Sequence, residues 1–150
     1  MPKREHKIFT LVLVSAPNEI IKVEEFLEGI NESLALGDTR YNKLLVATTE
    51  AVNNGIIHGN KRDPQKKVTL TCEVNNSSLT VKVQDEGGGV NPDALPNPLA
   101  EENLLRENGR GVFLMRRVMD ELSCQPRGER GNTLRMVKRC PRHPPAGQAG

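Results

Sequence analysis

Along the first half of the chain, the spacing of apolar residues changes from that of a β-strand to that of an α-helix. Residues 8–14 are rich in β-branched and aliphatic side chains, which predicts a first strand. After a break at 16–19, apolar positions recur at helical spacing and predict a first helix: Ile20, Val23, Phe26, Leu27 and Ile30. A second helix is expected from Asp38, its N-cap, to about Asn60, and residues 61–64 end it with a proline.

In the middle of the chain, apolar residues recur at every second position, as in a β-strand. Residues 68–74 and 79–84 alternate apolar and polar side chains, and a polar hairpin turn over 75–78 joins them. Residues 87–111 are rich in glycine, proline and asparagine, with a short helix expected around 99–105. Long loops in compact domains tend to carry function, so this segment is expected to be a lid.

Another helix and two more strands are expected before the end of the chain. The helix covers residues 112–119, and the strands cover 122–124 and 133–137 around a glycine-containing turn. The resulting order, β-α-α-β-β-lid-α-β-β, is dominated by hairpins and predicts a mixed, mostly antiparallel sheet. With helices on one face of that sheet, the expected fold class is α/β (α+β), a two-layer sandwich.

Length and composition indicate one domain. At 150 residues, with 36% apolar and 27% charged residues, the chain fits a soluble globular protein. The domain is expected over residues 7–140, between an N-terminal tail at 1–6 and a disordered, Pro/Gly-rich tail at 141–150.

The cysteines and the apolar runs indicate a cytoplasmic protein. Cys72, Cys124 and Cys140 form no C-x-x-C pair, so free thiols in a reducing compartment are expected. There is no signal-type stretch and no run of about 18 apolar residues, so no membrane association is expected. The formal charge of +2 and the 3% aromatic share, without tryptophan, argue against a nucleic-acid partner.

Glu50, Asn54 and His58 follow one another at intervals of four in the second predicted helix, so they should share one face. A carboxylate one turn from a carboxamide suits a hydrated Mg²⁺ ion that is shared with substrate phosphates. The spacing alone is equally compatible with an exposed polar helix face. The run Asn53-Asn54-Gly55 is a costly helix centre, however, and a broken local rule often marks a site.

Two glycine-rich segments add further candidate chemistry. Asp85 directly follows a strand and precedes Gly87 and Gly89, so its carboxylate can accept a hydrogen bond from the exocyclic amine of adenine while the backbone passes close to the base. Gly109-Arg110-Gly111 opens a helix, whose N-terminal amides suit phosphates. Each segment alone is also compatible with an ordinary turn, and the specificity comes from the three segments in this order.

These segments resemble a known family. Glu50-x-x-x-Asn54 with His58-Gly59, Asp85-x-Gly87-x-Gly89 and Gly109-x-Gly111 are similar to the N, G1 and G2 boxes of the GHKL ATPases, which share the Bergerat ATP-binding fold. The short chain and the ending Gly131-Asn132-Thr133 are most similar to the anti-sigma-factor serine/threonine kinases of the sporulation and general-stress type. The resemblance covers roughly residues 8–138, and the Pro- and Asn-rich lid departs from it.

The resemblance implies a role for each matching residue. Asn54 would hold Mg²⁺, and Glu50 would be the general base. Asp85 would read the adenine, with Thr133 near the adenine side. The remaining matching positions would bind the nucleotide: His58, Gly87, Gly89, Gly109, Arg110 and Gly111.

The resemblance also implies an activity and partners. The protein would be an ATP- and Mg²⁺-dependent protein serine/threonine kinase that acts as an anti-sigma factor and phosphorylates a STAS-type anti-anti-sigma protein. Its second partner would be a sigma factor, and a homodimer is compatible with this role. Two alternatives stay open: an ATP-sensing module that sequesters a partner without phosphotransfer, and an orphan catalytic domain of a histidine kinase system.

Overall fold

The computed structural model describes residues 6–75, 78–87, 113–126 and 131–139. Residues 113–118 are helical. The other elements follow in this order: β1 (Lys7–Val14), η1 (Pro17–Glu19), α1 (Ile20–Leu34), α2 (Asp38–Asn54), η2 (Gly55–Gly59), β2 (Lys67–Val74), β3 (Ser78–Gln84), β4 (Glu121–Pro126) and β5 (Asn132–Arg139).

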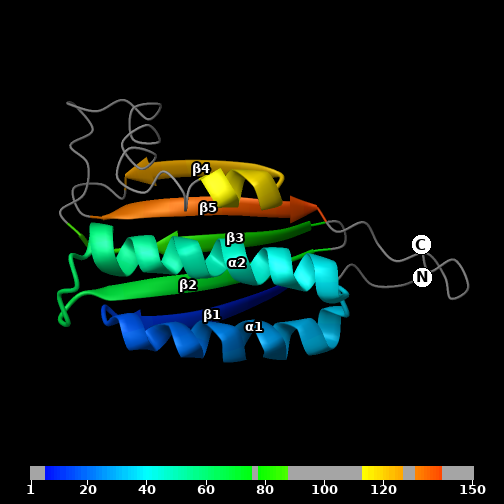
Figure 1. Cartoon of the computed structure of the whole chain (residues 1–150), viewed down its shortest axis with the longest axis horizontal. Helices are drawn as coiled ribbons and strands as arrows, with labels where there is room; N and C mark the ends of the chain where they lie inside the picture. The colour runs from blue at the N-terminus through cyan, green and yellow to red at the C-terminus, as the bar shows by residue number, and fades with distance from the viewer. Residues whose placement is uncertain (1–5, 76–77, 88–112, 127–130, 140–150) are drawn as a thin grey trace, which may run out of the picture.

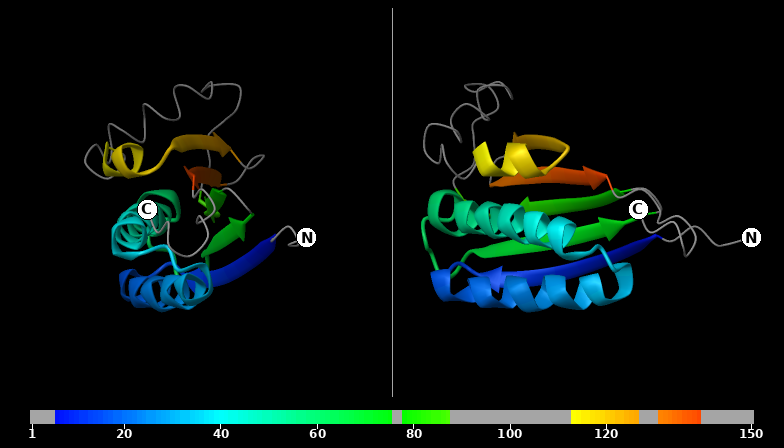
Figure 2. Two further views of the ribbon diagram at one scale, coloured as in Figure 1. Left: turned by 90° about the vertical axis from the view of Figure 1, so that its right-hand side faces the viewer. Right: turned by 45° about the vertical axis from the view of Figure 1, so that its right-hand side comes forward.

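The described strands form one five-stranded sheet in the order β1-β2-β3-β5-β4, and its neighbouring strands are antiparallel throughout. α1, α2 and residues 113–118 lie on one side of this sheet (Figures 1 and 2). The predicted two-layer sandwich with a mostly antiparallel sheet is therefore confirmed. The described strands do not show the mixed pairing that was expected, because α1 and α2 return the chain to the end of the sheet where β1 finishes, and β2 then runs against β1 (Figure 1).

The core lies between the sheet and the helices. Alternate residues of β2 are buried there, at Val68, Leu70 and Cys72. Val23 and Leu27, one turn apart on α1, are buried in the same core. Burying each Leu or Val side chain contributes about 1.5–3 kcal/mol, so these side chains hold the sheet and the helices together. None of the described helices is both long and apolar enough to cross a membrane.

The short connection from α1 to α2 contains two residues with positive φ. Ala35 ends α1 with φ 52°, and Asn31 Oδ1 accepts a hydrogen bond from Leu36 N at 2.9 Å. Gly37, with φ 87°, is the N-cap of α2, and Asp38 is the first helical residue, without a side-chain capping bond. The prediction that Asp38 is the N-cap is therefore wrong. Glycine occupies the cap because the backbone there takes a positive φ.

The hydrogen-bonding pattern of the second helix changes after α2. In η2 the chain continues as a π-helix, and Asn60 N donates to Gly55 O at 2.8 Å. The predicted helix end near Asn60 is thus confirmed. Glu50 and Asn54 lie one turn apart in the α-helical part, and His58 lies in the π-helical turn that follows. The shared face of all three residues stays a prediction.

Parts of the sequence prediction lie outside the described residues. They are the lid beyond Gly87 with its short helix at 99–105, the tail at 141–150, and four candidate site residues: Gly89, Gly109, Arg110 and Gly111. The described part of the candidate site therefore consists of its helix side and its strand side.

Candidate functional site

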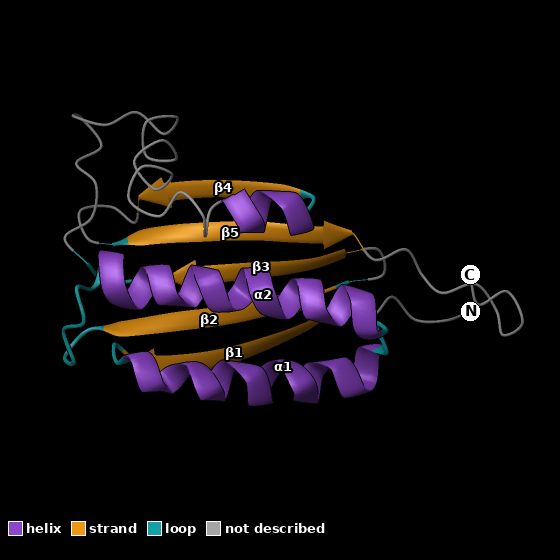
Figure 3. Ribbon diagram, in the orientation of Figure 1, coloured by secondary structure: helices purple, strands orange, loops and turns teal. Residues whose placement is uncertain are grey.

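One edge of the sandwich gathers the end of α2, the end of β3 and the start of β5 (left in Figures 1 and 3). Asp85 follows β3 and is only 7% exposed. Its Oδ1 atom accepts hydrogen bonds from the backbone N–H groups of Gly87 and Asn132, both at 3.1 Å. Its own N–H donates to Asn132 O at 3.0 Å. The carboxylate is therefore fixed where two segments distant in the sequence meet.

Three glycines near Asp85 occupy positions that leave no room for a side chain. A Cβ on Gly59 would collide with the carboxylate of Asp85, and one on Gly131 would collide with its backbone carbonyl. Gly131 also has φ 77°, which favours glycine. A Cβ on Gly87 would collide with the carbonyl of Gly59. The structure thus brings the predicted residues Asp85 and Gly87 together and packs both against η2.

Asn54, the last residue of α2, is 7% exposed, and its Nδ2 atom has no hydrogen-bond partner in the described part of the chain. Leaving a buried polar group unpaired costs about 1–3 kcal/mol, so Asn54 is suited to receive a polar ligand. A Cβ on the next residue, Gly55, would lie 3.7 Å from Asp85 Cβ. The structure therefore places Asn54 and Asp85 in the same region, next to Gly55.

Glu50 and His58 flank Asn54 along the helix. Glu50 lies one α-helical turn before Asn54 and is partly buried. His58 lies in the π-helical turn after it and is also partly buried. Glu50 therefore keeps the predicted position one turn before Asn54, and His58 follows Asn54 in the π-helical turn.

Asn132, which the sequence patterns did not single out, also belongs to this region. Its Oδ1 atom is buried without a partner among the described residues, and its side chain lies on the same face of β5 as the buried Leu134, two residues on. Thr133 lies on the other face, where its Oγ1 accepts a hydrogen bond from Gln84 Nε2 at 3.4 Å. The structure does not bring the Thr133 side chain to Asp85. The two-residue alternation of β5 could have identified Asn132, because it places Asn132 on the same face as the buried Leu134.

The two cysteines in the described residues, Cys72 and Cys124, have unreactive thiols. Burial, reinforced by the negative charge of Asp85, raises the pKa of the Cys124 thiol to about 11. Burial raises the pKa of the Cys72 thiol to about 12. Both thiols are free, as predicted, and protonated at neutral pH, so neither is a ready nucleophile.

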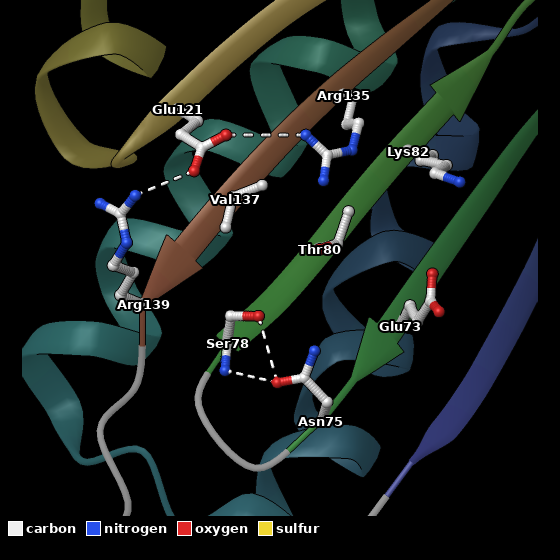
Figure 4. A pocket seen from close by; sticks show the side chains of 9 residues that line it. All are labelled: Glu73, Asn75, Ser78, Thr80, Lys82, Glu121, Arg135, Val137 and Arg139. Carbon is white, nitrogen blue, oxygen red and sulfur yellow. Dashed lines mark hydrogen bonds and ion pairs between the residues drawn. The ribbon is translucent and has the colours of Figure 1, made fainter.

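A separate hollow lies on the open face of the sheet, which α1 and α2 do not cover (Figure 4). It has a volume of about 410 Å³ and contains ion pairs from Glu121 to Arg139 (2.9 Å) and to Arg135 (3.7 Å). Its lining is mainly polar: Glu73, Asn75, Ser78, Thr80, Lys82, Glu121, Arg135, Val137 and Arg139. No predicted site residue lines it, so this hollow is distinct from the region around Asp85.

Within the described ranges, no group of three or more His, Cys, Asp or Glu side chains is arranged to hold a metal ion. The predicted Mg²⁺ site does not depend on such a group. Mg²⁺ is usually held by one or two protein oxygens together with water and substrate phosphates. The Oδ1 oxygen of Asn54 could supply that limited contribution, while the buried, unpaired Nδ2 atom is a donor and suits a phosphate oxygen.

The chain matches the model of the histidine kinase-like ATPase domain over residues 13–138. This match includes α2, Asp85 and nearly all of β5. The chain therefore belongs to the histidine kinase-like ATPase domain family, and the predicted membership of the GHKL superfamily is confirmed. ATP binding is the property that this family implies.

Curated relatives extend the comparison. An anti-sigma F factor of Clostridium perfringens is 27% identical over 141 residues, which are 93% of this chain and 91% of the relative. Anti-sigma F factors of Geobacillus thermodenitrificans and Oceanobacillus iheyensis are 31% and 29% identical over 98 residues. These 98 residues are 64% of this chain and 67% of each relative.

A solved structure supports the fold. The mycobacterial sensor histidine kinase MprB superposes with a TM-score of 0.54 at 16% identity, covering 92% of this chain and 99% of that one. At this level of identity, the likeness concerns the fold alone.

Proposed function

We propose that this protein is an ATP- and Mg²⁺-dependent protein serine/threonine kinase that acts as an anti-sigma factor and phosphorylates a STAS-type anti-anti-sigma protein. The observation that carries the proposal is the buried arrangement of Asp85, Asn54 and Asn132 at one edge of an ATPase-family domain. The names of the relatives support the choice of partners, a sigma factor and an anti-anti-sigma protein.

Asp85 is assigned to the base of the nucleotide. An ionised carboxylate only accepts hydrogen bonds, at about four lone-pair sites, so it suits the exocyclic amine of adenine. The two backbone N–H groups that bind Oδ1 fix its direction before any ligand arrives. Asn132, with a buried Oδ1, adds a second acceptor beside it.

Asn54 and Glu50 are assigned to the phosphate end. Asn54 would hold Mg²⁺ together with the phosphates, and the ion would neutralise the charge of the transferred phosphoryl group. Glu50, one turn earlier on the same helix, would accept the proton of the incoming Ser or Thr hydroxyl. His58, Gly87 and Thr133 remain candidate contributors to nucleotide binding.

The direct test is incubation of the whole protein with γ-labelled ATP, Mg²⁺ and purified STAS-type proteins from the same genome. Acid-stable label on a serine or threonine of one of them is the expected result. Acid-labile label would indicate the histidine kinase alternative. Tight ATP binding with no label on any partner would favour the alternative of an ATP-sensing, partner-sequestering module.

A further inference from the structure

Asn60 connects the end of the site helix to three other segments. It follows η2 directly and is only 1% exposed. Its Nδ2 atom donates hydrogen bonds to Ser15 Oγ at 2.7 Å and to Lys67 O at 3.0 Å. Its Oδ1 atom accepts a hydrogen bond from Glu86 N at 2.7 Å. Both polar atoms of the carboxamide are therefore committed to fixed partners.

Two of these partners make further bonds. Ser15 Oγ donates to Lys66 O at 2.6 Å, and Glu86 Oε1 accepts from Lys67 N at 2.6 Å. These bonds connect the end of β1, the start of β2 and the segment after β3 to Asn60, the residue that follows η2. The bond from Asn60 Nδ2 to Ser15 Oγ is buried, and a low dielectric strengthens a hydrogen bond in such surroundings.

The backbone beyond Asn60 is held in a strained form. Lys61 and Arg62 have φ values of 52° and 60°, which are unfavourable for residues with a side chain. Arg62 N donates to Ile56 O at 2.8 Å across the turn. Such conformations persist where the surrounding structure determines them strongly. The side-chain bonds of Asn60 supply that determination at the first residue of the turn.

Glu86 transmits the position of Asn60 to the site. Its two neighbours in the chain are Asp85 and Gly87, and Gly87 N donates to Asp85 Oδ1. Gly59, which precedes Asn60, is in close contact with both of these neighbours. The position of the Asp85 carboxylate relative to the helix end is therefore set by two adjacent pairs of residues, Gly59 with Asn60 and Glu86 with Gly87.

We propose that Asn60 is a positioning residue for the nucleotide. It fixes the helix end that carries Asn54 relative to the strand exit that carries Asp85, and thereby sets the affinity for adenine nucleotides. This inference rests on the proposed function, since it concerns the same site. Asparagine suits the position because one side chain must both donate and accept.

The test compares three variants of the whole chain: Asn60→Ala, Asn60→Asp and Ser15→Ala. Ser15→Ala is the matched control, because it breaks the same network on the side remote from Glu86. Calorimetry gives the affinity for ATP, thermal unfolding gives the stability, and NMR amide exchange without nucleotide reports on the Glu86 N–H group.

Asn60→Ala is expected to weaken ATP binding about tenfold or more, the scale of leaving one buried hydrogen bond unmade, and to speed Glu86 amide exchange. Ser15→Ala is expected to lower stability while the ATP affinity and Glu86 exchange stay close to wild type. Asn60→Asp keeps the acceptor for Glu86 N and loses the donor bonds to Ser15 Oγ and Lys67 O, so its affinity should lie between those of Asn60→Ala and Ser15→Ala.

Equal loss of affinity in Asn60→Ala and Ser15→Ala at similar loss of stability would overturn the proposal, because Asn60 would then be structural only. Wild-type affinity in Asn60→Ala would overturn it as well. Should Asn60→Ala not fold, equal affinities of Asn60→Asp and Ser15→Ala would contradict it. Wild-type protein that binds ATP without transferring phosphate contradicts the kinase function and leaves this comparison in force.

Discussion

The Oδ1 atom of Asp85 accepts a hydrogen bond from the backbone N–H of Asn132 at 3.1 Å. A second bond, from Asp85 N to Asn132 O at 3.0 Å, closes the pair. Asp85 therefore extends the pairing of β3 with β5 and at the same time presents a carboxylate in a buried region. The bonds from Gly87 N and Asn132 N need only an acceptor at Oδ1, so an amide substitution can keep them while it changes what is offered to the nucleotide.

Asp85→Asn should preserve the fold and impair nucleotide recognition. The carboxamide keeps an acceptor for Gly87 and Asn132 but replaces the other oxygen with a donor, which repels the exocyclic amine of adenine. We expect calorimetry to show ATP binding weakened at least about tenfold, with the preference for ATP over GTP lost. Glu25→Gln removes the same charge from an exposed residue of α1, away from the bonds around Asp85, and should leave both unchanged. Retained affinity and preference in Asp85→Asn would show that the base is read elsewhere.

Gly59→Ala should disturb the site through packing alone. The added methyl group would collide with the Asp85 carboxylate, and overpacking of this kind typically costs about 1–3 kcal/mol. We expect a lower free energy of unfolding and weaker ATP binding in the same variant. Gly29→Ala is the matched control, because a Cβ there meets nothing within 4 Å and alanine favours the α1 helix. Equal effects of the two substitutions would contradict the close packing around Asp85.

The helices and strands could be predicted because their signals are local. β2 alternates buried with more accessible residues along its whole length, and α1 buries positions at helical spacing. The cap of α2 was assigned to Asp38, since the positive φ of Gly37 depends on how α1 ends at Ala35. Propensity at one residue does not contain that constraint.

The candidate site was predictable in part. The spacing of Glu50 and Asn54 and the acidic residue after β3 identified its two sides. The π-helical hydrogen bonding of η2 could not be predicted, because apolar spacing up to Asn60 is equally compatible with a regular α-helix. The choice between Asn132 and Thr133 depends on the register of β5, and a shift of one residue exchanges the two faces of a strand.

The buried thiols provide a test of the native packing with pH. The pKa of the Cys124 thiol is raised by burial and by Asp85, so the native state favours the protonated form. The stability that this contributes is present below the thiol's ordinary pKa near 9 and is lost as pH rises toward 11. In a Cys140→Ser background, we expect slow alkylation by iodoacetamide at pH 9 in the native protein and fast alkylation in urea. Equally fast alkylation in both conditions would contradict the burial of Cys72 and Cys124.

Glu50→Gln decides between the kinase and the binding module. The substitution keeps the size and helix propensity of the side chain and removes the group that would accept the hydroxyl proton. If Glu50 is the general base, phosphate transfer to the STAS-type partner should fall about 10²-fold or more. ATP affinity should change little, because Asn54 and Asp85 are unaltered.

Glu25→Gln on the exposed face of α1 is the charge-matched control, and its transfer rate should equal that of the wild type. The complex between Glu50→Gln and its partner should persist longer than that of the wild type, since no phosphate arrives to release the partner. Transfer by Glu50→Gln at the original rate would remove Glu50 from the catalytic role. Binding of ATP and partner by both proteins, with no phosphate transfer by either, would make the partner-sequestering module the better account of this protein.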